Sequence, residues 1–377
     1  MAAPLAYFDH AATTPLRPEA LDAMLPFLTE HFGNPSGSHA VSRAARAAVD
    51  DARVTVAEAL GCDPGEVVFT GGGTEADNLA LAGVVAGRGG SVVCSAVEHH
   101  AVLHATAALG GRVTGVGPDG VVDLDALAAT LDEDVSVVSV MLANNEVGVV
   151  QPLAEVATVV RRNAPNAVLH TDAVQAFGWL DVAALTKPAA LVAVSAHKFG
   201  GPKGVGALVV RAGTHVEPIL HGGGQERDRR SGTHNVAGIV GMAAAMRATV
   251  AGREATVARV GALRDRLADG LLAAVPGTVE TGVRADRIAG SCHLRFPGIE
   301  SEALLILLDD AGLCASAGSA CASGALEPSH VLAAMGVPRD EALAGLRLSL
   351  GVTTTDDEVD LALKTVPEAV ARLRVCE

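Results

Sequence analysis

Two side chains of this sequence stand in settings that favour covalent chemistry. Lys198 is one of only four lysines in the 377 residues and follows directly on the apolar run LVAVSA. Burial at such a strand end lowers the pKa of an amine, which can then attack an aldehyde and form a Schiff base, whereas a typical lysine extends into solvent. Cys321 lies in CASAGSACASGALEPSH, a run of small residues over 314–330 with little apolar bulk to bury a thiol. We therefore interpret Cys321 as a reactive thiol rather than a packed one, whereas the choice between a nucleophilic and a solvent-exposed Lys198 depends on what lies at the other strand ends.

Polar side chains also follow other apolar runs. Asp172 ends the run AVLHTD, where a buried carboxylate needs a cationic partner. The corner GGGT favours a phosphate at a helix start, although it matches neither GxxxxGK[ST] nor GxGxxG, and glycine corners without ligands are common. His99 could lie against a flat ligand and relay protons. A metal pair of His100 and His104 is an alternative, but neither HExxH nor a third ligand accompanies it, so we expect no metal.

One cofactor would use all of these strand-end residues together. Pyridoxal 5′-phosphate (PLP) needs an amine for its aldehyde, an acid for its ring nitrogen, a flat partner for its ring and a cradle for its phosphate. Lys198, Asp172, His99 and the corner at Gly73–Thr74 meet the four demands in turn. Lys203 is a rival for the amine, but its setting GGPKGVG is typical of an exposed turn. The sequence therefore predicts a PLP site at the ends of several strands.

The elements that must position these groups alternate along the chain. Short β-branched apolar runs are separated by helical patterns between about residues 65 and 215. The runs are EVVFT, SVVCSA, VSVVSVML, AVLHTD, LVAVSA and VGALVVR. This alternation predicts an α/β fold with a mostly parallel sheet, whose ligands lie at the carboxyl ends of the strands. An Ala-rich pattern over 236–275 predicts a long helix leading into a smaller α+β domain.

Composition and charge narrow the class of protein. Apolar residues make up 49% of the chain but aromatic residues only 2%, which suits parallel strands covered by helices. The formal net charge of −15 disfavours direct nucleic-acid binding. No apolar run approaches the ~20 residues of a membrane span, and the start MAAPLAYFDHAATT does not resemble a signal peptide. Six cysteines without a CxxC pair disfavour a zinc knuckle or a disulfide framework, so we expect a cytoplasmic protein with reduced thiols and no membrane association.

With Lys198 and Cys321 identified, nearly the whole chain resembles the cysteine desulfurases of the NifS/IscS type, within the class V aminotransferase-like, fold-type I PLP enzymes. The motifs that carry the resemblance are YFDHAATTP, FGNPSGSH, VVFTGGGTEADNLA, VEHHAV, ANNEVGVVQP, HTDAVQ, SAHKFGGPKGVGAL, HGGGQERDRRSGT, ASAGSACASGALEPSHVL and LRLSLG. The resemblance implies a large PLP-binding α/β domain over 14–250, with a mostly parallel seven-stranded sheet. A smaller α+β domain would comprise 1–13 and 251–377 and carry a mobile cysteine loop at about 314–330.

The resemblance also implies roles for individual residues. Lys198 would form the Schiff base and carry protons, Cys321 would accept sulfur, and His99 would stack on the ring and assist protonation. The implied cofactor-binding residues are Gly73, Thr74, His99, Asn145, Asp172, Gln175, Ser195, His197, Lys198 and Thr233. Thr233 would reach the phosphate of the neighbouring subunit in a homodimer. Asn34 and Arg347 would hold the substrate carboxylate, the arginine through its two-pronged geometry.

The implied activity is that of a cysteine desulfurase, which converts L-cysteine into L-alanine and leaves a persulfide on Cys321. A sulfur-acceptor protein, such as an iron–sulfur scaffold or a thiolation enzyme, would then take the sulfur, and a mobile loop would permit the transfer. The alternatives are a selenocysteine lyase, a cysteine sulfinate desulfinase or a class V aminotransferase, which need no essential cysteine, and a scaffold protein without turnover. Gly73, His100 and Ala196 depart from residues common in the family, but none of them removes a reacting group.

Overall fold

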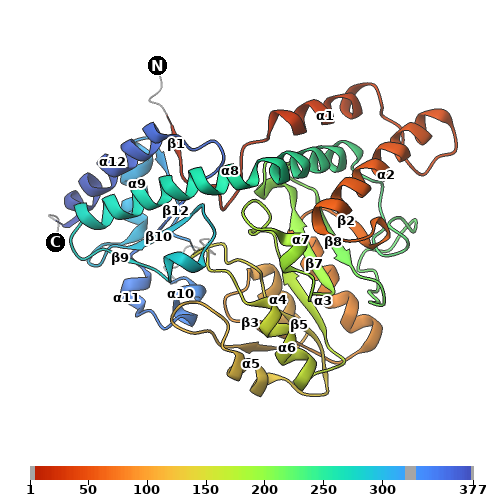
Figure 1. The fold of residues 1–377 in the computed structure, drawn as a ribbon, viewed down its shortest axis with the longest axis horizontal. Helices are drawn as coiled ribbons and strands as arrows, with labels where there is room; N and C mark the ends of the chain where they lie inside the picture. The colour runs from red at the N-terminus through yellow and green to blue at the C-terminus, as the bar shows by residue number, and fades with distance from the viewer. Residues whose placement is uncertain (1–4, 319–327, 375–377) are drawn as a thin grey trace.

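The computed structural model describes residues 5–318 and 328–374, and a seven-stranded sheet is its largest layer (Figure 1). The strands, in spatial order, are β2 (Val67–Thr70), β8 (Gly206–Val210), β7 (Leu191–Ser195), β6 (Val168–Asp172), β5 (Val135–Ser139), β3 (Ser91–Ser95) and β4 (Arg112–Thr114). β8 runs antiparallel to both of its neighbours, whereas the other neighbouring pairs are parallel. The predicted α/β class and mostly parallel sheet are therefore confirmed.

Helices cover both faces of this sheet because successive side chains of each strand point to opposite sides. In β2, Val67 and Phe69 join one hydrophobic cluster, and Val68 joins the other. The helices that close the first cluster are α1 (Pro18–Thr29), α2 (Ala40–Leu60), α5 (Leu124–Thr130), α6 (Leu153–Asn163) and the start of α8 (Val236–Ala274). The helices that close the second are α3 (Gly73–Arg88) and α4 (His100–Ala108). Burial on both faces explains why the strands are continuous apolar runs in the sequence.

The long helix α8 connects this core to a second one, as Figure 1 shows. Its first half buries Ile239 and Met246 against the seven-stranded sheet, and its second half buries Val260 and Leu267 in a separate cluster. A helix of 39 residues rises about 58 Å at 1.5 Å per residue, which is enough to reach both cores. The helix predicted over 236–275 is confirmed.

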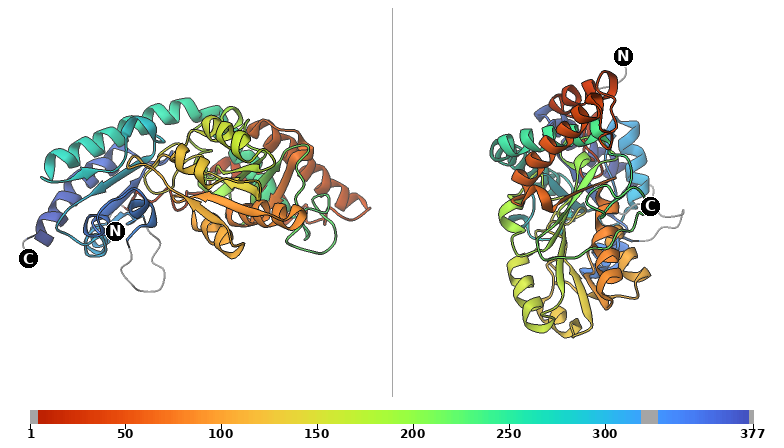
Figure 2. Two further views of the ribbon diagram at one scale, coloured as in Figure 1. Left: turned by 90° about the horizontal axis from the view of Figure 1, so that it is seen from below. Right: turned by 90° about the vertical axis from the view of Figure 1, so that its right-hand side faces the viewer.

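The second core lies around a smaller antiparallel sheet. Its strands, in spatial order, are β12 (Gly345–Ser349), β10 (Ser291–Arg295) and β9 (Val279–Glu280). The helices that pack on it with α8 are α9 (Ser301–Asp310) and α12 (Asp356–Arg374). Near the N-terminus, β1 (Ala6–Tyr7) pairs in parallel with β11 (Leu313–Cys314), so the first described strand belongs to the second core, beside C-terminal parts of the chain (Figure 2). The remaining short helices include α7 (Val182–Leu185), α10 (His330–Ala334) and α11 (Arg339–Ala342).

Three further features concern the sequence predictions. β4 has only three residues, RVT, and follows a glycine pair; a strand of this length gives no periodic signal, and we did not predict it.

No helix in the described ranges is both long and apolar enough to cross a membrane. The four described cysteines, Cys62, Cys94, Cys292 and Cys314, are free thiols.

Candidate active site

The segments that follow β2, β3, β5, β6 and β7 meet at one edge of the large sheet, where the carboxyl ends of the parallel strands lie together. A cavity of about 430 Å³ opens there and also reaches β12 of the second core. The predicted site residues that line it are Gly73, Thr74, His99, Asn145, Asp172, Gln175, Ser195, His197, Lys198 and Arg347. Ten residues chosen from six separate stretches of sequence therefore share one cavity.

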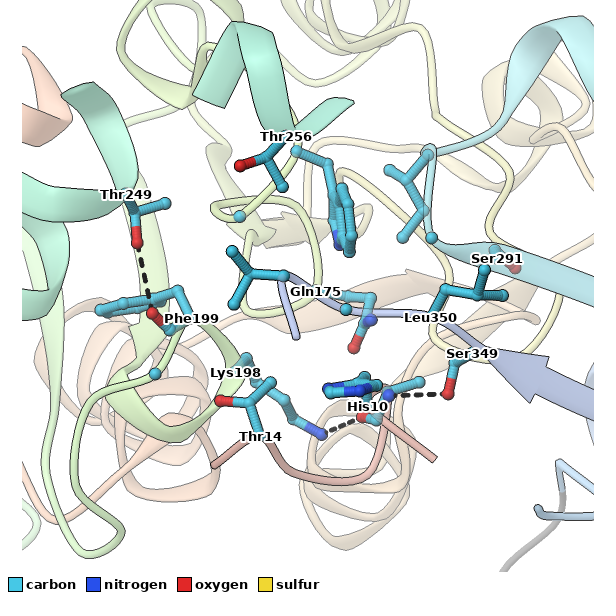
Figure 3. A pocket seen from close by; sticks show the side chains of 18 of the residues that line it. His10, Thr14, Gln175, Lys198, Phe199, Thr249, Thr256, Ser291, Ser349 and Leu350 are labelled. Atoms are coloured by element: carbon cyan, nitrogen blue, oxygen red, sulfur yellow. Dashed lines mark hydrogen bonds between the residues drawn. The ribbon is translucent and has the colours of Figure 1, made fainter. Parts of the chain in front are cut away.

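Lys198 ends the short 3₁₀ turn Ala196–Lys198 that follows β7. Its Nζ donates hydrogen bonds to the carbonyl oxygens of Ala11 at 2.5 Å and Ala12 at 2.9 Å. Figure 3 shows the lysine reaching toward this N-terminal segment, beside Gln175 and His10, from the side of an adjoining smaller cavity. Burial and, to a smaller extent, the charge of Arg347 lower the pKa of the Lys198 amine from 10.5 to about 8, against the opposing charges of Asp172 and Asp9. At neutral pH a larger fraction of the Lys198 amine is therefore unprotonated than in an exposed lysine.

Asp172 is the last residue of β6 and is buried. Its Oδ1 accepts a hydrogen bond from the backbone N–H of Val174 at 2.8 Å. Burial outweighs this hydrogen bond and the charge of Lys198, which both lower the pKa of the Asp172 carboxyl, so that the pKa rises from 3.8 to about 6. A carboxylate in this position gains most from a cationic partner, as the sequence predicted.

His99 is the residue that caps the N-terminus of α4. Its Nδ1 accepts a hydrogen bond from the backbone N–H of Ala101 at 3.1 Å, so the neutral ring carries its proton on Nε2. Burial lowers the pKa of His99, and the charge of Lys198 acts in the same direction. The capping bond therefore fixes both the ring orientation and the tautomer of a proton donor at the cavity wall.

The corner between β2 and α3 has the backbone geometry of an anion cradle. Gly72 adopts a φ of 146°, in a region that other residues rarely enter, and α3 begins at Gly73. A Cβ on Gly73 would lie 2.8 Å from Cγ2 of Val174, so glycine at this position avoids a close contact. Ser195 and His197 face the same corner from the end of β7, and His197 Nδ1 lies 3.2 Å from Oγ1 of Thr13. The free N–H groups of a helix start there favour a phosphate.

Lys203, the other candidate amine, does not line the cavity with Asp172. It is exposed and lines an open hollow on the outer side of the Gly71–Thr74 corner. The structure therefore separates the two lysines: only Lys198 shares the cavity with the buried acid.

Arg347, in the middle of β12, is 5% exposed. Its Nη2 pairs with Oδ1 of Asp9 at 2.8 Å, and its Nη1 donates to the carbonyl oxygen of Asn145 at 3.0 Å. Its backbone forms two hydrogen bonds with Ser316, which also lines the cavity. The second core thus supplies a fixed cation to a site built mainly by the first.

Three predicted residues are not placed in the cavity of this single chain. Asn34 is exposed, and its Oδ1 accepts a hydrogen bond from the backbone N–H of Ser36 at 3.0 Å. Thr233 is also exposed, on the loop over 221–235. Cys321 lies outside the described residues, although Gly318, just before that segment, lines the cavity.

The loop that carries Thr233 is fastened by Glu226, a buried carboxylate with a φ of 51°. It accepts hydrogen bonds from Arg53 at 2.6 and 2.8 Å, from His234 at 2.7 Å and from the backbone N–H of Phe69 at 2.9 Å. Although burial raises the pKa of Glu226, the hydrogen bonds from Arg53 and His234 bring it down to about 2. The carboxylate ties the loop to β2, the strand that leads into the glycine corner.

Sequence reasoning missed three acids around the cavity. Asp9 and Asp77 line it, and Glu98 is fully buried and accepts a hydrogen bond from the backbone N–H of Met141 at 2.6 Å. Burial raises the pKa of Glu98 to about 8, and burial together with Asp172 raises that of Asp77. In the sequence each of these acids resembles an ordinary surface residue of a turn or a helix start.

Comparisons with known proteins find similar sequences and a similar structure over nearly the whole chain. The family model described as Aminotransferase class-V matches residues 6–362. The IscS-like cysteine desulfurase of Mycobacterium tuberculosis is 46% identical over 385 residues, covering 98% of this chain and 97% of that protein. Cysteine desulfurase IscS of Methanosarcina thermophila is 44% identical over 376 residues, covering 98% and 92%. A solved NifS-like protein superposes with a TM-score of 0.91 at 36% identity, covering 98% of this chain and 100% of that one.

Proposed function

Since the chain belongs to the class-V aminotransferase family, as its motifs predicted, we propose that it is a PLP-dependent cysteine desulfurase. The observation that carries the proposal is the convergence of an amine, an acid and a guanidinium on one cavity, at Lys198, Asp172 and Arg347. The amine and the acid suit the aldehyde and the ring nitrogen of PLP, and the guanidinium suits the carboxylate of an amino acid.

The residues around the cavity fit the cofactor. Gln175 Oε1 is buried and has no hydrogen-bond partner within the described part of the chain, which suits a polar ring substituent. The residues that would hold PLP are Lys198 at the aldehyde, Asp172 at the ring nitrogen, His99 on the ring face, Asn145 and Gln175 at the substituents, and Gly73, Thr74, Ser195 and His197 at the phosphate. When bound, PLP supplies an electron sink for the carbon atoms of the substrate.

The side chains of the protein then divide the work. Arg347 would hold and orient the substrate carboxylate. Lys198, whose pKa is close to neutral pH, would move the proton at Cα, and His99 would donate from Nε2. The thiolate of Cys321 would attack the substrate sulfur: its Sγ forms an S–S bond, the C–S bond of cysteine breaks, and the carbon takes up a proton to give alanine. No external oxidant or reductant is required.

We extend the proposal to a homodimer. Thr233 and Asn34 are exposed in the single chain, as residues that serve a neighbouring subunit would be. On α1, Leu21, Leu25 and Leu28 are 45%, 45% and 62% exposed and recur on one helical face. An apolar stripe of this kind favours burial against a second copy of the chain.

Two further predictions belong to the same proposal. A division into a large domain over 14–250 and a small one formed by 1–13 and 251–377 is supported by the separate hydrophobic clusters on the two halves of α8. Sulfur transfer from Cys321 to an acceptor protein in the cytoplasm stays a prediction, for which the names of the relatives are the support.

The decisive experiment compares two cysteine variants of the PLP-loaded protein. Cys321→Ser should abolish the formation of alanine from L-cysteine while retaining the cofactor absorbance. Cys314→Ser is the matched control, because Cys314 is a partly exposed thiol on β11 near the same segment, and it should retain activity. If Cys321→Ser turned over cysteine like the unmodified protein, or acted equally well on selenocysteine or cysteine sulfinate, a lyase without an essential thiol would replace the proposal.

A further inference from the structure

The cation proposed to bind the substrate carboxylate already has a carboxylate partner in the protein. Arg347 donates from Nη2 to Oδ1 of Asp9 at 2.8 Å and from Nη1 to the carbonyl oxygen of Asn145 at 3.0 Å. Its Nε is buried and has no hydrogen-bond partner among the described residues. Both Asp9 and Arg347 line the cavity, so the ion pair lies where a bound amino acid must place its carboxylate.

The backbone of Asp9 is held in place by hydrogen bonds. The turn over 9–13 is closed by hydrogen bonds from Ala12 N to Asp9 O at 3.0 Å and from the Tyr7 hydroxyl to Asp9 O at 3.1 Å and to Thr13 O at 3.0 Å. Ser349, two residues after Arg347 on β12, accepts from Ala11 N through its Oγ at 2.9 Å. The turn and the strand therefore form one unit that sets the distance between the two charges.

The side chain of Asp9 is nevertheless only partly enclosed. It is 23% exposed, whereas that of Arg347 is 6% exposed. The arginine cannot leave its place without losing its burial and its contact with Asn145, but the aspartate can turn toward the open cavity. A buried guanidinium needs an anionic partner in every state of the protein, because an unpaired buried charge is strongly unfavourable.

We propose that Asp9 is a positioning residue that acts as the resting counter-ion of Arg347 and is displaced from Nη2 by the carboxylate of the incoming amino acid. This inference rests on the proposed role of Arg347 in substrate binding. Asp9 keeps the guanidinium oriented when no substrate is present, and it competes with the substrate, so it sets the concentration of amino acid needed to fill the site.

The same turn also supports the reactive amine. The carbonyl oxygens of Ala11 and Ala12, two and three residues after Asp9, accept both hydrogen bonds from Lys198 Nζ. The segment over 9–12 thus carries both the aspartate that the substrate would displace from Arg347 and the carbonyl groups that hold Lys198.

The first test is a chemical rescue of the apoprotein, which does not depend on turnover. Asp9→Asn keeps an oxygen acceptor for Nη2 but removes the charge, so the melting temperature should fall and acetate should restore it. Acetate should have no such effect on the unmodified protein or on the control Asp51→Asn, an exposed aspartate on α2, and chloride at equal ionic strength should not replace it.

The second test is kinetic. Because the substrate no longer has to displace a charged partner, Asp9→Asn should lower KM for L-cysteine about tenfold with a much smaller change in kcat, as expected for loss of a charged competitor. A protein in which the pair is merely structural would show neither acetate rescue nor a lower KM. Unchanged or raised KM without rescue would overturn the proposal.

The outcomes also separate this inference from the proposed function. If acetate rescued Asp9→Asn but the unmodified protein did not turn over cysteine, the proposed role of Asp9 would stand and the proposed desulfurase activity would fall. If the protein were an active desulfurase but Asp9→Asn changed neither the melting temperature nor KM, the activity would stand and the role of Asp9 would fall. If Asp9→Asn does not fold, Asp9→Ser serves as the second variant, and failure of both to fold even in acetate would show that no external carboxylate can replace Asp9, which refutes the proposal.

Discussion

In the apoprotein, labelling of Lys198 by a small amine reagent such as acetic anhydride should rise with pH up to about 8 and then level off, because only the neutral amine reacts and burial brings the pKa of Lys198 to about 8. An ordinary lysine continues to gain reactivity up to its usual pKa of about 10.4. At pH 7, a pKa near 8 leaves roughly 300 times more neutral amine than a pKa of 10.5 does, since each unit is a factor of ten.

The assay is a brief pulse of reagent at a series of pH values, followed by digestion and mass spectrometry of the peptide that contains Lys198. The variant Lys203→Arg serves as the control, because it removes the neighbouring lysine, which does not line the cavity with Asp172, and should leave the profile unchanged. Denatured protein at the same pH supplies the reference for reagent reactivity.

Two charge variants test the physical cause. The charge of Arg347 lowers the pKa of Lys198, so Arg347→Gln should move the midpoint to higher pH. The charge of Asp172 raises the pKa, so Asp172→Asn should move the midpoint to lower pH. A profile in the unmodified protein that keeps rising toward pH 10 would refute this account of the amine. A midpoint that moves to lower pH in Arg347→Gln, or to higher pH in Asp172→Asn, would refute it as well.

The remaining predictions concern the loop anchor, the glycine corner and the dimer. Glu226→Gln should lower the free energy of unfolding in urea by about 3 kcal/mol at neutral pH, because the folded pKa of about 2 lies below the unfolded value of 4.5, and the loss should fade as the pH falls from 4.5 toward 2. Gly72→Ala should cost about 1–3 kcal/mol of stability through its φ of 146°, whereas Gly65→Ala, with open space around the new methyl group, should not. Leu25→Glu should shift the protein toward a monomer in sedimentation, whereas Val113→Glu, a similarly exposed apolar position on β4, should not.

Local patterns were sufficient for most of the fold. The strands of the large sheet bury both faces, so β5 and β7 give mainly apolar, β-branched runs that stand out from the helices between them. The long α8 was equally clear from its length and its alanines. β4 was missed because three residues carry no period, and its pairing with β3 supplies the stability that its own sequence lacks.

The site was predictable in part for a related reason. Lys198 and Asp172 are charged residues at the ends of apolar runs, a contrast that marks them in one dimension. Asp9, Asp77 and Glu98 were not recognised, because each lies in a stretch typical of a turn or a helix start and becomes unusual only when distant elements enclose it.

The sequence by itself determined the alternation of strands and helices, the edge of the sheet where ligands bind and the residue types available for chemistry there, because these depend on period and neighbourhood along the chain. Only the tertiary structure decided which amine meets the buried acid, which acid pairs with Arg347 and how far each pKa moves from its usual value. Those properties arise from burial and from charges brought together across hundreds of residues, as Asp9 and Arg347 are, and no local pattern encodes such distances.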